Sequence, residues 1–184
     1  MPIANPPVVS VVISTYNTSA LLRECLKALR FQSALAKLEI IVVDSGSEQA
    51  EQEVCRQEAG HFPRLTYERT ERESLYAAWN RGLAKARGKY FVNVNTDDAL
   101  APDALEFFVR AMDNNLGVAL AYADCVWSPT PNASPPWPDS WKRVRYTPYA
   151  AEMALFYCFT SCTQFWRTSS LRDLGGFDPA FRAV

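Results

Sequence analysis

Two nearly continuous runs of β-branched residues constrain this chain more than any other feature of its sequence. VVSVVI at 8–13 and IIVV at 40–43 lack the alternation of apolar and polar residues expected of a strand with one solvated face. Such runs are typical of strands buried on both faces of a parallel sheet. A polar loop and a segment with helical spacing separate them. This order predicts an α/β fold in which helices flank a mostly parallel central sheet.

The segment between the two runs, and the one after them, carry helix signals. Apolar residues repeat at helical spacing at Leu22, Cys25, Leu26 and Leu29. Thr18 or Ser19 is expected to cap this helix by accepting a bond from its first free amides. Ser45 and Glu48 have the form of a capping box, which predicts a second, mostly polar helix that ends near Ala59.

Strands and helices are expected to alternate along the rest of the chain. The further strands that we predict are 65–67, 90–94, 118–123 and 158–165, and the further helices are 75–86, 102–117 and 168–174. A charged loop at 68–73 should lie over the crevice of the sheet. Gly88 is suited to closing the helix before it in the left-handed conformation, and Pro102 to a first helical position.

The composition is that of one ordinary globular domain, which we place over 1–184. Hydrophobic residues make up 48% of the chain and charged residues 21%, which argues against disorder. The net charge of −1 excludes a broad basic field, so no nucleic-acid partner is expected. The single histidine, His61, is expected at the surface.

The cysteines and the apolar runs bear on location. The five cysteines are widely spaced and lack the paired spacing of a zinc site, so we expect reduced thiols in a cytoplasmic protein. No apolar run approaches the ~20 residues that a membrane helix needs, and no membrane span is expected. Association of the full-length protein with a membrane, through residues outside this chain, stays open.

Two adjacent acids, Asp97 and Asp98, follow the predicted strand at 90–94. In an open α/β sheet, ligands bind in the crevice outside the carboxyl ends of the strands. Asp44 ends the strand at 40–43, so three carboxylates would face one crevice. Mg²⁺ and Mn²⁺ prefer carboxylate oxygen and are often shared with substrate phosphates. The acids therefore predict a metal site with a phosphorylated ligand, unless Asp97 and Asp98 are only surface acids at the start of the next helix.

Common phosphate-binding motifs are absent. The dinucleotide fingerprint GxGxxG does not occur, and the first strand ends in STYN without a glycine-rich turn. The segment 82–89 is not a P-loop, because five residues instead of four separate its glycines and Tyr90 stands where Ser or Thr is needed. A phosphatase with an aspartyl nucleophile would need an acid at the end of the first strand.

The segment 127–148 has a different character. It holds six of the twelve prolines and three of the five tryptophans, so no regular element is expected in it. Loops of this length inside a compact domain are usually lids or binding loops, or else disordered. Its tryptophans would form a sugar-stacking platform beside Lys142, Arg143 and Arg145, or the loop would simply pack against the domain.

Four stretches together resemble the family 2 inverting glycosyltransferases with the GT-A fold. They are VSVVISTYN at 9–17, EIIVVDSGS at 39–47, LYAAWNRGLAKARGKYFVNVNTDD at 75–98 and LGGFD at 174–178. In order, they resemble the nucleotide loop, the second strand, the D-x-D stretch and the turn before the acceptor-side helix. The resemblance implies a nucleotide-binding half at about 1–100 and an acceptor-side half at about 101–184, with the C-terminal part of the domain missing.

The resemblance also implies roles for individual residues. Asp98 would be the direct ligand of a Mn²⁺ or Mg²⁺ ion that bridges the diphosphate, and Asp97 would contact the ribose or assist the metal. Asp44 would accept hydrogen bonds from the base or the ribose. The remaining implied donor-site residues are Thr15, Tyr16 and Asn17 around the base, and Ser45, Arg72, Asn80, Asn95 and Thr96.

Two positions depart from the family pattern, and no residue is assigned as the general base. Asn95 stands at the first position of the usual D-x-D, and Trp79 replaces an arginine often found before Asn80. Inversion requires a general base near the acceptor hydroxyl, and in the family that acid lies shortly after the GGFD turn. We therefore expect the base beyond Val184, and Asp178 is expected to shape the turn.

The resemblance implies metal-dependent transfer of a sugar from a nucleotide diphosphate sugar, a UDP-sugar, to an acceptor hydroxyl with inversion. The acceptor would be a saccharide or a lipid-linked molecule in the synthesis of a cell-envelope polysaccharide. A non-catalytic domain that binds a nucleotide sugar or acts as a scaffold is the alternative, because no base is placed. A sugar nucleotidyltransferase would ordinarily show a glycine-rich, basic loop in place of STYN.

Overall fold

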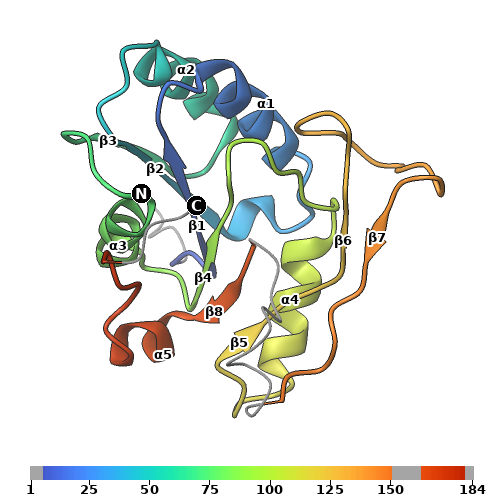
Figure 1. The fold of residues 1–184 in the computed structure, drawn as a ribbon. Helices are drawn as coiled ribbons and strands as arrows, with labels where there is room; N and C mark the ends of the chain where they lie inside the picture. The colour runs from blue at the N-terminus through green and yellow to red at the C-terminus, as the bar shows by residue number, and fades with distance from the viewer. Residues whose placement is uncertain (1–5, 151–162, 181–184) are drawn as a thin grey trace.

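The structure, a computed structural model, describes residues 6–150 and 163–180 (Figure 1). Within these residues a six-stranded sheet has the strand order β3-β2-β1-β4-β8-β5. Its strands are β1 (Val9–Thr15), β2 (Leu38–Asp44), β3 (Leu65–Arg69), β4 (Tyr90–Asn93), β5 (Leu120–Ala121) and β8 (Phe165–Arg167). The strands predicted at 8–13, 40–43, 65–67 and 90–94 are confirmed.

Strands β1 to β4 are parallel, and their register brings their carboxyl ends to one edge of the sheet. Thr15 of β1 lies opposite Asp44 of β2, and Asp44 lies opposite Arg69 of β3. On its other side β1 pairs with β4, with Val12 opposite Asn93. β8 runs antiparallel to both β4 and β5. The predicted α/β fold with a mostly parallel sheet is confirmed, and the loops after β1, β2 and β4 share one edge.

Helices cover both faces of the sheet. The larger hydrophobic cluster receives side chains from α1 (Ser19–Leu29), α2 (Glu51–Glu58) and α4 (Ala104–Asp113). The second cluster receives side chains from α3 (Leu75–Lys85) and α5 (Thr168–Asp173). The predicted helix at 168–174 is therefore confirmed as α5.

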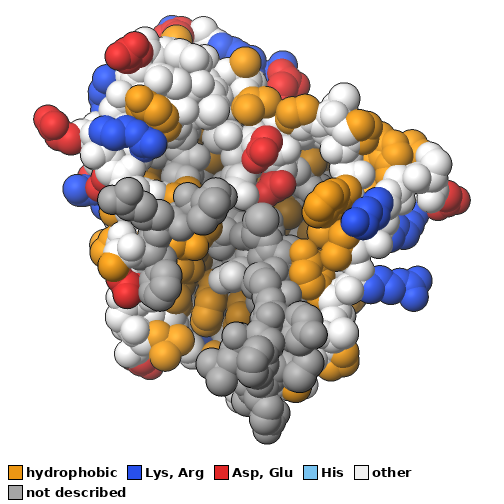
Figure 2. Space-filling view, viewed as in Figure 1, with side chains coloured by type: hydrophobic (Ala, Val, Ile, Leu, Met, Phe, Trp, Pro, Cys, Tyr) orange, Lys and Arg blue, Asp and Glu red, His pale blue; other side chains and the backbone are white. Residues whose placement is uncertain are grey.

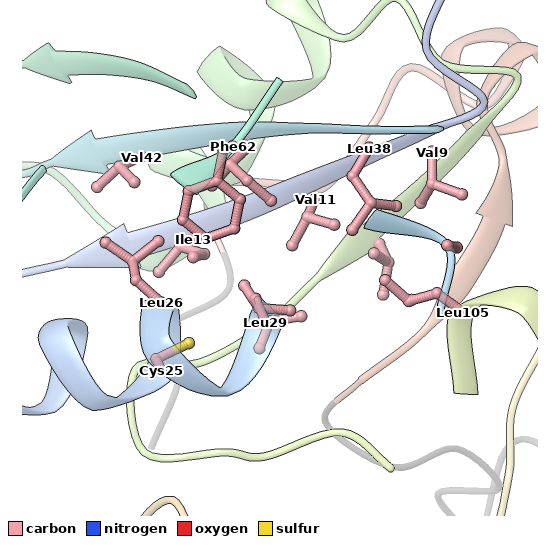
Figure 3. Close-up of a cluster of buried hydrophobic side chains, with 14 of the residues drawn as sticks. Val9, Val11, Ile13, Cys25, Leu26, Leu29, Leu38, Val42, Phe62 and Leu105 are labelled. Carbon is pink, nitrogen blue, oxygen red and sulfur yellow. The ribbon is translucent and has the colours of Figure 1, made fainter. Parts of the chain in front are cut away.

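The side chains of β1 show why its sequence is apolar throughout. Figure 3 shows Val11 and Ile13 facing Leu26 and Leu29 of α1. Val12 belongs instead to the cluster under α3. Successive side chains of a strand point to opposite faces, so a sheet with helices on both faces needs apolar residues at consecutive positions.

Two glycines allow close packing around β1. A Cβ on Gly82 of α3 would lie 2.3 Å from Cγ1 of Val12, and a Cβ on Gly88 would lie 2.6 Å from the amide nitrogen of Ser10. The prediction that Gly88 ends the helix in the left-handed conformation is wrong, because the positive-φ glycines of the described residues are Gly46, Gly175 and Gly176. Gly88 serves close approach rather than chain reversal.

The caps predicted for α1 and α2 are wrong: distant side chains bind the first amides of α1, and α2 has Ala50 as its N-cap, with no side-chain cap bond. Thr18 is the N-cap of α1 but makes no side-chain cap bond. The amide of Thr18 donates to Oε1 of Glu51 at 2.9 Å, and that of Ser19 to Oε1 of Gln49 at 3.1 Å. α2 begins at Glu51, not at the supposed capping box of Ser45.

Helix α4 also begins later than predicted, at Ala104 instead of Pro102, and it ends at Asp113. The predicted strand at 118–123 is reduced to the two residues of β5. The predicted strand at 158–165 lies mostly outside the described residues, and β8 begins at its last position. His61 lies exposed in the 3₁₀ turn Ala59–His61, as predicted.

The segment 127–148, which we call the proline-rich segment, contains one strand that was not predicted from the sequence. β6 (Cys125–Val126) pairs with β7 (Arg143–Val144) in a separate antiparallel ribbon, which carries a long loop at its tip (Figure 1). The amide of Trp127 donates to the carbonyl of Lys142 at 2.9 Å and extends the pairing. The prediction that 127–148 holds no regular element is therefore wrong for β7.

Two further expectations concern cysteines and membranes. Cys25 and Cys55 are buried free thiols and Cys125 is a half-buried one, whereas Cys158 and Cys162 lie outside the described residues. Among the helices in residues 6–150 and 163–180, none is long and apolar enough to span a membrane.

Candidate functional site

Two neighbouring cavities lie at the carboxyl edge of the sheet. The smaller cavity, of about 390 Å³, lies among the loops after β1, β2 and β4. The larger cavity, of about 680 Å³, lies between the loop after β4, helix α4 and the proline-rich segment. Asp97 lines both cavities, so the two adjoin at the predicted acidic stretch.

Most of the predicted donor-site residues line the smaller cavity. They are Thr15, Tyr16, Ser45, Arg72, Asn95, Thr96 and Asp97. They come from four separate segments of the chain. The parallel register of β1, β2 and β4 brings three of those segments to the same edge, which is where ligands bind in open α/β sheets.

Tyr16 and Arg72 form a stacked pair at the smaller cavity. Cζ of Arg72 lies 3.8 Å from the centroid of the Tyr16 ring, within the range of a cation–π contact. The Tyr16 side chain is 42% exposed, so one face of this pair is open to solvent. Arg72 therefore brings the charged stretch after β3 to the cavity, whereas Glu68 and Arg69 of the loop predicted at 68–73 belong to β3.

Asp44 does not reach either cavity in the described structure, which corrects the expectation that three carboxylates face one crevice. Its side chain is fully buried. Oδ1 accepts from the amide of Ser47 at 2.8 Å, and Oδ2 accepts from the hydroxyl of Tyr67 at 2.6 Å. Burial, with the bond to the Asp44 carboxylate, raises the pKa of Tyr67. Asp44 thus supports the wall of the smaller cavity from behind.

Asn17 also acts in the structure as a link between loops. It has a left-handed backbone, with φ 53°. Its amide donates to Oγ of Ser47 at 2.9 Å, and its Oδ1 accepts from the amide of Glu48 at 2.7 Å. These bonds tie the loop after β1 to the loop after β2, beside the smaller cavity.

The acids follow β4 on a tight turn, Asn95–Asp98, which we call the carboxylate turn. The amide of Asp98 donates to the carbonyl of Asn95 at 3.2 Å, and Nδ2 of Asn95 donates to Oδ2 of Asp98 at 3.0 Å. Asp97 is exposed and Asp98 is half-buried. Burial raises the pKa of Asp98, and the charge of Asp97 raises it further.

The carboxylate turn fits a divalent cation that is shared with phosphates. No group of three or more His, Cys, Asp or Glu side chains within residues 6–150 and 163–180 could hold a metal alone. Mg²⁺ and similar ions need only one or two carboxylates when waters and substrate phosphates complete the shell. Burial, and then the charge of Asp97, raise the pKa of Asp98, and a bound cation would offset both effects.

Asn80 lies away from the described lining of both cavities, where it holds the glycine turn near the end of the chain. Its Nδ2 donates to the carbonyl of Phe177 at 2.6 Å, and its Oδ1 accepts from the Phe177 amide at 2.9 Å. Gly176, with φ 82°, would place a Cβ 2.5 Å from that Oδ1. These two bonds between Asn80 and Phe177, which we call the Asn80 clamp, replace the implied donor contact of Asn80.

Trp79 and Asp178 lie next to the Asn80 clamp. The buried Trp79 ring lies 5.1 Å from that of Phe177 in an edge-on arrangement, so the residue that departs from the family pattern packs against the same turn. Asp178 is exposed, and its Oδ1 accepts from the amide of Ala180 at 2.9 Å. This bond fits the expectation that Asp178 shapes the turn.

The larger cavity has aromatic walls from the proline-rich segment. Its lining includes Asp98, Phe108, Trp127, Trp137 and Tyr146. Nζ of Lys142 lies 4.6 Å from the centroid of the Trp127 ring. Figure 2 shows hydrophobic side chains with Lys and Arg side chains beside them on this part of the surface. The loop packs against the domain through these residues, and the sugar-stacking platform stays a prediction.

Sequence analysis missed Asn132, a residue of the proline-rich segment that also lines the larger cavity. Its side chain contacts the carboxylate turn across 36 residues of sequence. Its position among prolines indicates a turn, but no local pattern indicates this distant contact.

The sequence matches a known protein family over most of its length. The family model described as "Glycosyl transferase family 2" matches residues 10–175. The chain belongs to glycosyl transferase family 2. The match covers the loops after β1, β2 and β4 and ends at Gly175, so the family extends over nearly all of the described structure.

Glycosyltransferases are among the proteins to which the chain is similar. The glycosyltransferase GlyA of Streptococcus pneumoniae is 34% identical over 98 residues, which are 53% of this chain and 14% of that protein. The uncharacterized glycosyltransferase YibD of Escherichia coli is 33% identical over 116 residues, which are 62% of this chain and 33% of that protein. The chain thus spans a third or less of the length of these relatives.

Solved structures show the same fold. The mannosyltransferase PcManGT from Pyrobaculum calidifontis, in complex with GDP-Man and Mn²⁺, matches with a TM-score of 0.70 at 24% identity, over 97% of this chain and 49% of that one. TarS 1–349 of S. aureus in complex with UDP matches with a TM-score of 0.73 at 17% identity, over 96% of this chain and 52% of that one. The family 2 chain therefore has the GT-A fold.

Proposed function

We propose that this protein transfers a sugar from a UDP-sugar to an acceptor hydroxyl, with a divalent cation and with inversion. The observation that carries the proposal is the position of Asp97, which lines the smaller cavity and the larger cavity at once. A transferase must hold a donor and an acceptor against one reacting bond. Two adjoining cavities that meet at a pair of acids meet that requirement.

The smaller cavity is the proposed donor site. The exposed ring of Tyr16 offers a face for a nucleotide base, and Thr15 and Ser45 offer polar groups near it. Arg72 lines the same cavity and would supply a positive charge for a diphosphate bound there. Solved structures of the same fold are complexes with GDP-Man, UDP and UDP-GlcNAc, which supports a nucleotide-sugar donor.

The carboxylate turn is the proposed metal site, with Asp98 as direct ligand and Asp97 beside it. A Mn²⁺ or Mg²⁺ ion held there would neutralise the negative charge that builds on the leaving diphosphate. Asn95 donates to one oxygen of Asp98 and so fixes the orientation of that carboxylate. Asp97 is exposed, at the boundary of both cavities, where it can face the ribose or the cation.

The larger cavity is the proposed acceptor site. Its aromatic walls suit the apolar faces of sugar rings, and a saccharide or lipid-linked acceptor in the synthesis of a cell-envelope polysaccharide fits them. We assign no general base among residues 6–150 and 163–180, and we keep Asp178, whose Oδ1 accepts from the amide of Ala180, as a residue of the turn. The second candidate is a domain that binds a nucleotide sugar without transferring it, because no base is assigned among the described residues.

A thermal-shift measurement with UDP tests the donor site and the metal site. A ligand that binds only the folded state stabilises it by about 2.7 kcal/mol at one hundred times its Kd. We expect UDP with Mn²⁺ to raise the Tm, and UDP alone to raise it less. Asp98→Asn should lose the extra gain from Mn²⁺, because it removes the charge that holds the ion.

Asp103→Asn is the matched control, since Asp103 is an exposed acid near the turn that makes no side-chain cap bond. It should keep the full gain. An equal gain from Mn²⁺ in Asp98→Asn and in the unmodified chain would contradict the metal assignment. Release of UDP from UDP-sugars in the presence of saccharide acceptors separates the transferase from the second candidate, which would bind and not release.

A further inference from the structure

We infer that Asn132 is a positioning residue for the carboxylate turn, and the inference rests on the proposed function. Asn132 belongs to the proline-rich segment and lies beside the turn only through the fold. Its amide donates to the carbonyl of Asp97 at 2.9 Å, and its Nδ2 donates to the carbonyl of Thr96 at 2.9 Å. Asn132 therefore binds both central carbonyls of the turn that carries Asp97 and Asp98.

The side-chain orientation of Asn132 follows from its partners. Nδ2 also donates to the carbonyl of Leu21 in α1, at 3.3 Å. Carbonyl oxygens only accept, so the amide nitrogen and not the oxygen must face Thr96 and Leu21. One side chain thereby connects helix α1, the carboxylate turn and the wall of the larger cavity.

The backbone of Asn132 is shaped for this contact. Its φ of 53° lies in the left-handed region, which Asn tolerates better than most residues with a side chain. That conformation allows its main-chain and side-chain donors to approach adjacent carbonyls together. Oδ1 is buried without a hydrogen-bond partner among the described residues. The orientation that lets Nδ2 donate to Thr96 and Leu21 therefore leaves the oxygen of the same amide unbonded.

Holding the turn matters because the turn is short. The carboxylates of Asp97 and Asp98 can share a cation with a diphosphate only while their separation and direction stay fixed. One internal backbone bond, from the amide of Asp98 to the carbonyl of Asn95, closes the turn at 3.2 Å. Asn132 adds a second restraint from outside, and the same contact fixes the acceptor-side loop against the metal site.

Two substitutions separate this role from simple loop anchoring. Asn132→Gly keeps the left-handed backbone and its amide donor but removes Nδ2. Asn132→Asp keeps the shape but sets a carboxylate oxygen, which cannot donate, against the carbonyl of Thr96. Ser134→Ala is the matched control, because Ser134 is exposed in the same loop and lies outside the described lining of both cavities.

The experiment combines calorimetric titration of UDP, with and without Mn²⁺, and amide hydrogen exchange at 94–100. Loss of a residue that orients metal ligands typically weakens metal binding by 10–100-fold. We expect both Asn132 variants to lose about tenfold or more in Mn²⁺-dependent UDP affinity and to exchange the Asp98 amide faster. UDP binding without Mn²⁺ should stay unchanged, and Ser134→Ala should match the unmodified chain throughout.

Wild-type Mn²⁺–UDP affinity in Asn132→Gly, or unchanged exchange at the turn in both variants, would overturn the inference. A failure of the proposed function looks different, because the unmodified chain itself would then show no Mn²⁺-dependent binding of UDP. In that case exchange alone decides whether Asn132 holds the turn: faster exchange of the Asp98 amide in Asn132→Gly supports it, and equal exchange overturns it.

Discussion

Asp44 ends the parallel strand β2 and Asp98 lies in the turn after the parallel strand β4, yet their surroundings give them different roles. The carboxylate of Asp44 is fully buried and accepts hydrogen bonds from the amide of Ser47 and the hydroxyl of Tyr67. Asp98 is half-buried, lines the larger cavity and lies next to the like charge of Asp97. Asp44 therefore stabilises the fold. At Asp98, burial and the charge of Asp97 disfavour the negative charge of the carboxylate, and a bound cation would offset this cost.

This contrast predicts opposite effects on stability. Asp44→Asn replaces an acceptor with an NH₂ group opposite a donor and leaves a buried bond unmade, which should lower the free energy of unfolding by about 1–3 kcal/mol. Asp98→Asn should not lower it, because it removes a charge that burial and Asp97 disfavour. Urea unfolding of both variants provides the measurement. A larger loss in Asp98→Asn than in Asp44→Asn would contradict the two assignments.

The elements themselves could be predicted from the sequence, because their patterns are local. The apolar runs of β1 and β2 and the spacing of α1 and α3 depend only on which faces are buried. The caps could not be predicted, since the first amides of α1 bond to Glu51 and Gln49, about 30 residues away. β7 and the antiparallel direction of β8 likewise depend on partners that no local pattern specifies.

Gly82 of α3 provides a test at this scale. Alanine is about 1 kcal/mol better than glycine inside a helix, but here its Cβ would lie 2.3 Å from Cγ1 and 2.7 Å from Cγ2 of the buried Val12. Overpacking of this kind typically costs 1–3 kcal/mol. We expect Gly82→Ala to lower the free energy of unfolding by roughly that range, as measured in urea.

Gly60→Ala serves as the control for Gly82→Ala, because a Cβ on Gly60 would meet nothing within 4 Å. It should be neutral or slightly stabilising, since alanine restricts the unfolded chain. If Gly82→Ala were the more stable of the two variants, the close packing of α3 on β1 would not be the reason for glycine at position 82.

In the whole molecule, the candidate site forms because the parallel register gathers distant loops at one edge. Residues near positions 15, 45, 72 and 97 meet in the smaller cavity, and this gathering could be predicted from the strand order. The contact of Asn132 with the carboxylate turn could not be predicted, because its partner Thr96 lies 36 residues away in the sequence and no local pattern links the two. Asn80 was assigned to the donor and instead holds Phe177, since helix position alone does not fix which partner a side chain meets.

The central claim is that the smaller cavity holds the nucleotide of the donor and the carboxylate turn holds a cation on its diphosphate. A crystal structure of the chain with UDP and Mn²⁺, with the metal located by anomalous scattering, tests both parts at once. The account predicts the uracil against Tyr16 and a manganese peak bonded to the Asp98 carboxylate and to the diphosphate. UDP bound elsewhere, or manganese bonded to neither Asp97 nor Asp98, would contradict it.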